Sequence, residues 1–467
     1  MTLLLIGLLV LPALAALLVV GVRRKAAVAS RIALLVTVLA LVCGLGLLLF
    51  GERDVPLPLT WLPGSEPWSL HVGGVGLYAL AVTNLCALAT RIRGLSLGEI
   101  PEWRTDALFL VGLAASNGAF LFAHLLARYV ALEIVALIVA AMALTALHPD
   151  VGSQAASFVY LMLRVGDAGL LAAILLLRDA TGTLVIGEAL ARGAALDGAA
   201  QMWIAGCLVL AVWVKVGAWP FHSWLRVGAA LLTSSAIWAY GVVMPNLGLY
   251  LLYRVAPLLF ASGLNPLMLG FGVATMVPGL WQIIRNADGE SLVIHGNSVL
   301  AGLALIAVSQ GAVGVVALLL LVVAPIRMWL WWRAEQQSLL QGSLSRSLES
   351  FGIALRNLVE DQILDRGPVA LAQAVIRGAE LLRKWVERAG EDALIKATWT
   401  SVQSSAETLQ HRLEYGRVGE GPLGAVAGVV LYLARQIQRL HTGRLRIRLA
   451  WVVLTLATAL VVTLLVL

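Results

Sequence analysis

The chain has 467 residues, of which 60% are hydrophobic and only 13% are charged. A water-soluble domain carries roughly 25% charged residues, so this composition excludes a soluble globular protein. Because so few residues are charged, we expect a lipid bilayer to surround the chain. The formal net charge is +7, and we expect no nucleic-acid partner.

The apolar residues come in continuous blocks of about 20 residues, the length of a helix that crosses a bilayer. These blocks do not alternate with a period of two, which favours helices over a β-barrel. The sequence therefore predicts an all-α polytopic membrane protein of about twelve transmembrane helices. The predicted spans lie near residues 2–20, 32–50, 73–90, 107–124, 129–147, 155–177, 201–221, 229–253, 265–284, 291–309, 312–332 and 446–467.

The charges of the first two loops predict the orientation in the membrane. The first loop contains Arg23, Arg24 and Lys25, whereas Glu52 and Asp54 lie in the second. Basic loops stay in the cytoplasm, so we expect a multi-pass protein of the bacterial inner (plasma) membrane with its N-terminus outside. The first block lacks a basic start and a cleavage site, so we expect a retained helix rather than a signal peptide.

Cysteine usage and motifs predict a chain without a redox centre. Cys43, Cys86 and Cys207 all lie in apolar blocks, where buried structural thiols are expected. The chain has no GxGxxG after a strand, no P-loop and no HExxH motif. We therefore expect it to bind no cofactor and no metal.

The stretch 334–443 has a different character, because it is polar and rich in Gln, Arg and Glu. Its apolar residues Leu371, Val375, Leu382 and Trp385 recur at helical spacing. This pattern predicts an amphipathic lateral segment of several helices on the cytoplasmic side of a membrane or against partner subunits, and a plain cytoplasmic linker is the alternative.

Four ionisable residues lie inside predicted spans: Glu133, Arg164, Asp167 and Lys215. Such charges are costly in a bilayer, so they are usually paired, hydrated or functional. Arg164 and Asp167 lie one turn apart on one helix face, and we expect them to pair with residues of a neighbouring subunit. Glu133 and Lys215 have the chemistry of a proton relay, because a nearby carboxylate changes how tightly a buried lysine holds its proton. A static ion pair that fixes helix packing is the alternative.

Two histidines in or near predicted spans are further candidates. His222, beside Trp219 and Trp224, lies at an expected cytoplasmic helix end, where it can titrate near neutral pH or serve only as an interfacial residue. His295 forms a polar pair with Asn297 inside another apolar span, and both roles are open there as well.

Three motifs resemble the antiporter-like subunits of respiratory complex I. KVGAWPFHSWL at 215–225 is similar to the family signature, RVGD at 164–167 resembles the preceding helix, and TGTL at 181–184 fits the loop that follows it. Glu133 resembles the glutamate of the family's earlier span. The resemblance implies that 107–333 is a proton-pathway region consisting of one repeat and part of a second, preceded by N-terminal transmembrane helices at 1–106.

The carboxyl end resembles subunit L of NADH-quinone oxidoreductase, a family related to multi-subunit cation/proton antiporters. The resemblance lies in the amphipathic segment 334–443, followed by HTGRLRIRLAW and an anchoring helix within 444–467. It implies a non-redox membrane-arm subunit that translocates or gates protons through Glu133 and Lys215. Quinone reduction elsewhere in the complex would drive this transfer, and the partners would be other membrane-arm subunits.

The chain departs from the family pattern in its second half. Where the family has Pro-Thr-Pro and then a histidine, this chain has Leu232-Thr233-Ser234 and Tyr240, and tyrosine is a poor relay at neutral pH. Pro245 is a candidate for a displaced helix break, and Glu290 stands where the family has a lysine. About four spans of the second repeat are missing, so we expect a shortened member. The alternative functions are a non-pumping scaffold subunit, or a subunit of an inorganic-carbon or cation/proton transport complex.

Overall fold

The computed structural model describes residues 1–60, 66–99, 102–146, 149–196, 198–231, 233–285 and 289–341. The last predicted span and all of the predicted lateral segment beyond residue 341 lie outside the described residues.

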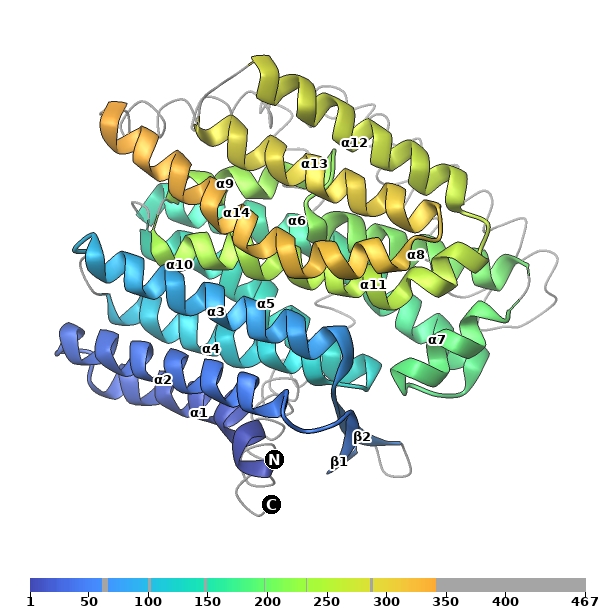
Figure 1. Cartoon of the computed structure of the whole chain (residues 1–467), viewed down its shortest axis with the longest axis horizontal. Coiled ribbons are helices and arrows are strands. Elements are labelled where there is room, and N and C mark those ends of the chain that lie inside the picture. The colour runs from blue at the N-terminus through green and yellow to red at the C-terminus, as the bar shows by residue number, and fades with distance from the viewer. Residues whose placement is uncertain are drawn as a thin grey trace, which may run out of the picture. The chain divides into compact units, whose positions relative to one another are not determined.

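Helices make up almost all of the described chain (Figure 1). In chain order they are α1 (Thr2–Gly21), α2 (Ala26–Leu47), α3 (Gly74–Ser96), α4 (Trp103–Leu121), α5 (Leu125–Ala146), α6 (Pro149–Thr181), α7 (Ile186–Ala194), α8 (Ala199–Val216), η1 (Phe221–Ser223), α9 (Trp224–Leu231), α10 (Ser234–Ala236), η2 (Ile237–Val243), α11 (Met244–Ala261), α12 (Asn265–Arg285), α13 (Gly289–Ser309) and α14 (Val313–Gln341).

Nine helical stretches within the described residues are long and apolar enough to cross a membrane. The predicted spans near 107–124 and 291–309 form α4 and α13, which are not among the nine, and the apolar part of α13 covers only Val293–Ser309. The prediction of an all-α polytopic membrane protein is confirmed.

The long helices lie side by side (Figure 1), with α1 packed on α4, α6 on α8, and α12 on α13. Large apolar side chains such as Leu17 and Trp203 remain exposed on the outer surfaces of the bundle. Exposed apolar surface of this kind suits a lipid environment, in which every backbone polar group must be bonded inside a helix.

The helix that carries Lys215 is broken near its middle. α8 ends at Gly217, which has a φ of 66° in the left-handed region that favours glycine. The chain continues through η1 into α9, and the 33 residues Ala199–Leu231 form one stretch that is long and apolar enough to cross a membrane. Lys215 lies at the midpoint of this span. His222 lies in η1, between the end of α8 and the start of α9, and the helical stretch continues beyond it to Leu231.

A second interruption follows α9. Thr233 is extended and caps α10, and the chain then forms the π-helical segment η2. Pro245 does not displace this break, because it lies in the first turn of α11, directly after η2.

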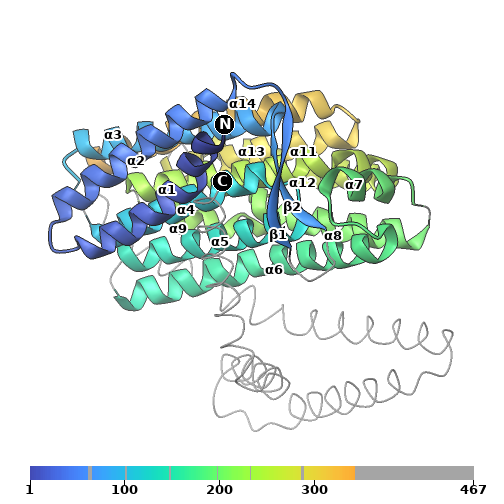
Figure 2. The same cartoon turned by 90° about the horizontal axis from the view of Figure 1, so that it is seen from below.

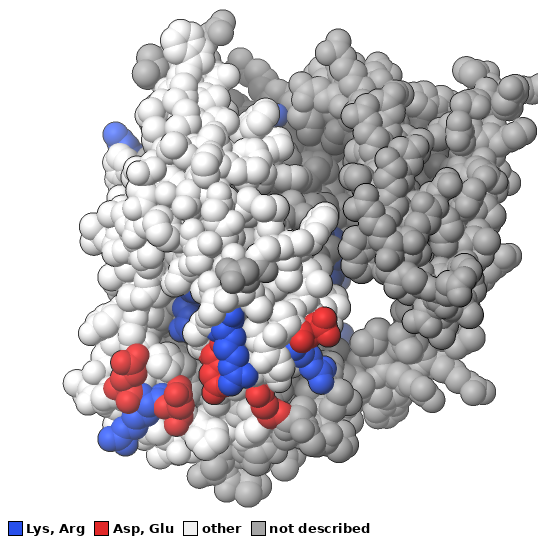
Figure 3. Space-filling view, turned by 90° about the vertical axis from the view of Figure 1, so that its right-hand side faces the viewer, with Lys and Arg blue, Asp and Glu red and all other residues white. Residues whose placement is uncertain are grey.

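Two short strands, absent from the predicted fold, fill part of the loop before α3. β1 (Arg53–Thr60) pairs antiparallel with β2 (Pro67–Val72), with Arg53 opposite Val72. The burial of β2 alternates along PWSLHV, as expected for a strand with one covered face. This hairpin lies at the same end of the bundle as α7 (Figure 2), and acidic and basic side chains gather at that end (Figure 3).

Candidate functional site

Close packing of α6 against α8 positions the candidate site. A Cβ at Gly166 would lie 2.8 Å from the Cβ of Val214, and one at Gly169 would lie 2.9 Å from the carbonyl oxygen of Cys207. Only glycine leaves room for this approach. Asp167, between the two glycines, thereby comes within reach of Lys215 on α8.

Lys215 and Asp167 form an ion pair in the interior of the bundle. The Lys215 ammonium donates to Oδ1 of Asp167, and the side chains are 0% and 1% exposed. Oδ2 of Asp167 has no hydrogen-bond partner. A buried carboxylate oxygen without a partner is costly, and it is an available acceptor for a proton or a water molecule.

A second pair lies beside the first. Arg164, one turn before Asp167 on α6, contacts the carboxylate of Glu133 on α5. Glu133 also interacts electrostatically with Asp167 and Lys215, so the four side chains form one cluster with two positive and two negative charges. We call these four residues the charge cluster.

The pairing differs from the sequence-based expectation. The sequence predicts that Glu133 partners Lys215 and that Arg164 and Asp167 reach a neighbouring subunit. Within the described residues, Asp167 instead partners Lys215 and Arg164 partners Glu133. The spacing in the sequence shows which residues share a helix face, but it does not show which of two carboxylates a lysine on another helix will contact.

Asn297 holds the broken end of α8, which carries Lys215. Its amide donates to the carbonyl oxygens of Val216 at 3.0 Å and Gly217 at 3.2 Å. These are carbonyls that a helix end leaves without a partner. His295, close to Asn297 on α13, lies with its ring 6.3 Å from that of His222. The structure therefore places both histidines and Asn297 near the break in this span.

Tyr240 does not join the charge cluster. Tyr240 is completely buried in η2, its hydroxyl has no hydrogen-bond partner, and its ring lies 6.0 Å from that of Trp224. Gly228 lies against the same ring. Glu290 lies in the first turn of α13, and its side chain is outside the described residues.

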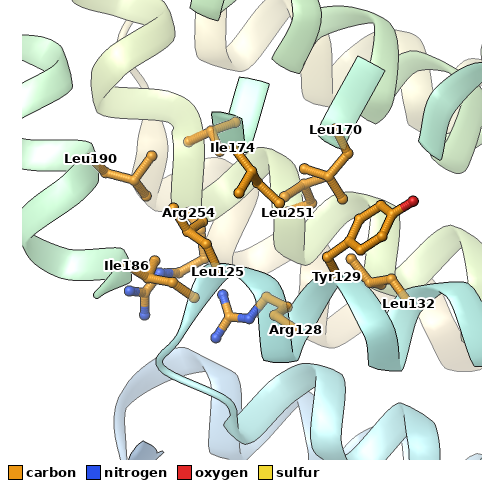
Figure 4. Close-up of a pocket in the computed structure, with 11 residues that line it drawn as sticks. Leu125, Arg128, Tyr129, Leu132, Leu170, Ile174, Ile186, Leu190, Leu251 and Arg254 are labelled. Atoms are coloured by element: carbon orange, nitrogen blue, oxygen red, sulfur yellow. The ribbon is translucent and has the colours of Figure 1, made fainter. Parts of the chain in front are cut away.

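A small cavity of about 20 Å³ is lined by residues of α5, α6, α7 and α11 (Figure 4). A cavity of this size holds about one water molecule. It is lined by Arg128, Tyr129 and Arg254 together with apolar side chains, and Tyr129 lies one helical turn before Glu133. Arg128 donates to the hydroxyl of Tyr250 at 3.4 Å. Sequence reasoning missed Arg128 because it lies near the end of a predicted span, where basic residues are common.

Sequence reasoning also missed a polar junction at the hairpin end of the bundle, formed by Glu66 with Thr183 and Leu184. The carboxylate of Glu66 accepts hydrogen bonds from Thr183 and from the backbone N–H of Leu184, both at 2.9 Å. Burial on its own would raise the pKa of Glu66, but these bonds and the nearby His124 lower it. Burial lowers the pKa of His124, and the charge of Glu66 partly offsets this effect. TGTL at 181–184 thus supplies a structural contact between loops.

Within the part of the chain that the structure describes, no group of three or more His, Cys, Asp or Glu side chains is arranged to hold a metal ion. The arrangement of the charge cluster suits proton transfer between buried acids and a lysine.

Comparison with known proteins agrees with this architecture. Residues 123–326 match the family described as NADH:quinone oxidoreductase/Mrp antiporter, TM. Over these residues the chain is similar to the antiporter-like membrane subunits. NADH-quinone oxidoreductase subunit L of Campylobacter jejuni is 28% identical over 172 residues, which are 36% of this chain and 28% of that protein. A protein named as antiporter subunit mnhD2 of Staphylococcus saprophyticus is 24% identical over 295 residues, 62% of this chain and 58% of the relative.

Solved structures share the fold of this chain. A chain of the Mrp complex from a Dietzia species matches 71% of this chain and 36% of its own length, with 20% identity and a TM-score of 0.63. Respiratory complex I from Thermus thermophilus contains a chain that matches with 20% identity and a TM-score of 0.58, covering 72% of this chain and 71% of the other. The chain spans less than two thirds of the length of both curated relatives.

Proposed function

We propose that this protein is a membrane-arm subunit that moves protons through the charge cluster. The observation that carries the proposal is the ion pair of Lys215 with Asp167, which is shielded from solvent beside a second pair made by Glu133 and Arg164. Buried ionisable groups in a membrane span are functional candidates because they are costly to keep there.

The proposed transfer depends on a change of partner. Lys215 is charged while it contacts Asp167. When Glu133 leaves Arg164 and approaches, the lysine faces two carboxylates and holds its proton more tightly. When both carboxylates withdraw, the ammonium loses its partners and passes one proton to a water or to a neighbouring acceptor. Loading and release of one proton per cycle then follow from electrostatics alone.

The break in the span gives Lys215 the freedom that this cycle requires. Lys215 belongs to the last turn of α8, where carbonyl groups carry partial negative charge that favours a cation. Asn297 stabilises that end from α13. His222 and His295 lie on the far side of the break and are the proposed acceptors toward the cytoplasm.

A static scaffold is the second candidate function, and Tyr240 favours it. The hydroxyl of Tyr240 is buried and has no hydrogen-bond partner. A residue in this state does not conduct protons along a hydrogen-bonded chain. In this alternative, the pair of Lys215 and Asp167 only fixes the packing of α6 on α8.

Loss of the lysine separates the two functions. Complex yield and proton translocation are measured in inverted membrane vesicles that contain the intact complex. Four proteins are compared: the parent, Lys215→Met, Asp167→Asn and the double variant. Proton transfer predicts that translocation is lost in Lys215→Met and stays lost in the double variant. The scaffold predicts poor yield in both single variants, recovery of yield in the double variant, and no change in translocation per assembled complex.

We further propose that the partners are other membrane-arm subunits. The solved relatives belong to assemblies named Mrp complex and respiratory complex I, and both kinds fit the fold. In the first assignment, proton transfer is coupled to cation exchange, and in the second to quinone reduction elsewhere in the complex. The proposed lateral segment at 334–443 docks on these partners, and 444–467 anchors it. Purification of the intact complex with identification of its subunits by mass spectrometry decides between the two.

The proposed location is the plasma membrane of a bacterium, with the N-terminus outside. The loop between α1 and α2 carries Arg23, Arg24 and Lys25, and basic loops stay in the cytoplasm. Single cysteines at Ser96 and Arg53 test this orientation. Both positions are exposed: Ser96 is the last residue of α3, and Arg53 is the first residue of the hairpin that precedes the other end of α3. Ser96→Cys should react with an impermeant reagent only from the cytoplasm and Arg53→Cys only from outside, and the reverse pattern would invert the topology.

A further inference from the structure

A cavity of about 290 Å³, lined by both polar and apolar groups, lies at the end of the bundle where α3 ends and α4 begins. At about 30 Å³ for each water molecule, it has room for roughly ten waters. Its described lining contains hydroxyl side chains, three carboxylates and one guanidinium. The charge cluster does not contribute to this lining.

A buried ion pair forms the inner part of the cavity. Nη2 of Arg91 lies 2.7 Å from Oδ1 of Asp106 and donates to the hydroxyl of Ser30 at 3.2 Å. Asp106 is only 2% exposed, and its Oδ2 has no hydrogen-bond partner in the structure. A buried carboxylate oxygen in the lining of such a cavity requires a hydrogen-bond donor, and a proton or a water molecule supplies one.

The other two acids lie nearer to solvent. Glu99 accepts hydrogen bonds from the backbone N–H of Ser234 at 2.9 Å and from its hydroxyl at 2.7 Å. Glu102 accepts from Thr105 at 3.3 Å. Both acids are half-buried, whereas Asp106 is fully buried. The carboxylates therefore become progressively less exposed toward the interior, and the three acids with one arginine give the lining a net negative formal charge.

The cavity and the charge cluster are connected through α5. Thr145 lines the cavity and follows Glu133 by twelve residues on this helix, a distance of about 18 Å along a helix. Phe109, one turn inward from Asp106, packs against Trp238 with ring centroids 4.5 Å apart. A Cβ at Gly112, another turn inward, would lie 3.3 Å from the Trp238 ring. We call the contact of Phe109 with Trp238 the aromatic layer.

We propose that this cavity is a proton-collecting vestibule, in which Glu99 and Glu102 gather protons at the mouth and Asp106 is the inner acceptor. This role rests on the proposed proton transfer, whereas the three carboxylates and the volume of the cavity are independent of it. Transfer inward passes a proton from a cavity water to Oδ2 of Asp106 and then to a water admitted when the aromatic layer opens. Thr233 lines the cavity and caps the helical stretch that carries Trp238.

The ligand is a proton rather than a dehydrated metal cation. Arg91 occupies one oxygen of Asp106 and competes with any metal ion for it. The described acids do not form a cluster of three that could hold a metal. Protons require only water and an acceptor, and both fit the cavity.

Cysteine labelling tests the vestibule independently of pumping. In a chain whose three native cysteines are replaced, Thr145→Cys places a thiol in the lining. A small cationic thiol reagent should modify it about tenfold faster than an anionic reagent of the same size, and Glu99→Gln with Glu102→Gln should remove most of that difference. Ser96→Cys, exposed at the same end but outside the lining, is the matched control with little charge preference. Equal rates at Thr145→Cys, or no reaction, would overturn the vestibule.

Proton uptake tests its role. In the intact complex, Asp106→Asn should slow proton translocation about tenfold, Asp106→Glu should retain most of it, and Glu99→Gln with Glu102→Gln should slow it without disturbing the buried pair. Unchanged translocation in all three, in a complex that Lys215→Met inactivates, refutes the vestibule and leaves the proposed function standing. Slow uptake in Asp106→Asn, with normal translocation in Lys215→Met, refutes the role of the charge cluster and supports the vestibule.

Discussion

The ammonium group of Lys215 contacts the carboxylate of Asp167 across the interface of α8 and α6, at the midpoint of a broken membrane span. Neither side chain reaches solvent. A pair in this position is costly to form, since both charges lose their hydration. It persists because two glycines on α6 bring the helices close and because Asn297 supports the end of α8.

Removal of one charge from this pair should destabilise the protein. Asp167→Asn leaves the Lys215 ammonium buried without its counter-charge, and we expect a loss of about 3–5 kcal/mol. The double variant Asp167→Asn with Lys215→Met should recover most of the loss. Thermal unfolding in detergent measures both, with the exposed Asp179→Asn as the control. Equal stability of the single variant and the parent would show that the pair is not buried as described.

The approach of α6 to α8 should tolerate no side chain at Gly166. Gly166→Ala places a methyl group 2.8 Å from Val214, so the helices must separate, and we expect a cost of about 1–3 kcal/mol. A methyl group at Gly187 on α7 would meet no neighbour within 4 Å, so Gly187→Ala provides the matched control. Thermal unfolding in detergent should show a lower midpoint temperature for Gly166→Ala but not for Gly187→Ala. An equal shift in the two variants would argue against close packing of α6 on α8.

Asn297 should matter more than its neighbour on α13. Asn297→Ala frees the carbonyls of Val216 and Gly217, and each unsatisfied buried group costs about 1–3 kcal/mol. Ser298→Ala loses only a bond to the carbonyl of Ile294 within its own helix. Hydrogen exchange around residues 214–218 should rise in Asn297→Ala and stay unchanged in Ser298→Ala. Faster hydrogen exchange in Ser298→Ala than in Asn297→Ala would contradict the role of Asn297 in stabilising the end of α8.

Acidification should loosen the junction at the hairpin end. The pKa of Glu66 is lowered in the folded chain, so its stabilisation is present above the unfolded value of about 4.3 and is lost as the pH falls through the folded value. The pKa of His124 is also lowered. Its protonation in the unfolded chain therefore favours unfolding as the pH falls below about 6.5.

The protection factor of the Leu184 amide, which Glu66 binds, measures this junction. It should decrease in the parent as the pH falls below about 6.5 because of His124, and further as the pH falls below about 4.3 because of Glu66. Glu66→Gln should begin with lower protection and respond less to pH, and Glu188→Gln, exposed on α7, is the control. Protection that is independent of pH in the parent would contradict the assignment.

The membrane spans and the residues of the charge cluster could be predicted because both depend on local signals. Long apolar blocks have few alternatives to helices in a bilayer, and Glu133, Arg164, Asp167 and Lys215 are conspicuous inside such blocks. The pairing could not be predicted, because it depends on the distance between α6 and α8. That distance follows from two glycines beside Asp167, whose effect is visible only when the helices are placed.

Charges near helix ends were harder to interpret. Arg91 and Asp106 lie near the ends of α3 and α4, where the sequence suggests solvated loop residues, yet they form a buried pair. Glu66 and His124 were missed for the same reason. The break at Gly217 was also hidden, because KVGAWPF reads as the end of a span until the helix beyond it is seen to continue.

The most direct test of the account is proton translocation by the intact complex carrying Lys215→Arg. Arginine keeps a positive charge opposite Asp167, but its guanidinium does not release a proton in proteins. Complex yield is measured alongside, and Lys215→Met with Asp167→Asn gives the translocation of an assembled complex that lacks both charges. If Lys215 loads and releases a proton, the arginine variant should assemble and lose at least nine tenths of its translocation. Parental translocation in an assembled Lys215→Arg complex would contradict the relay and leave the pair with a structural role alone.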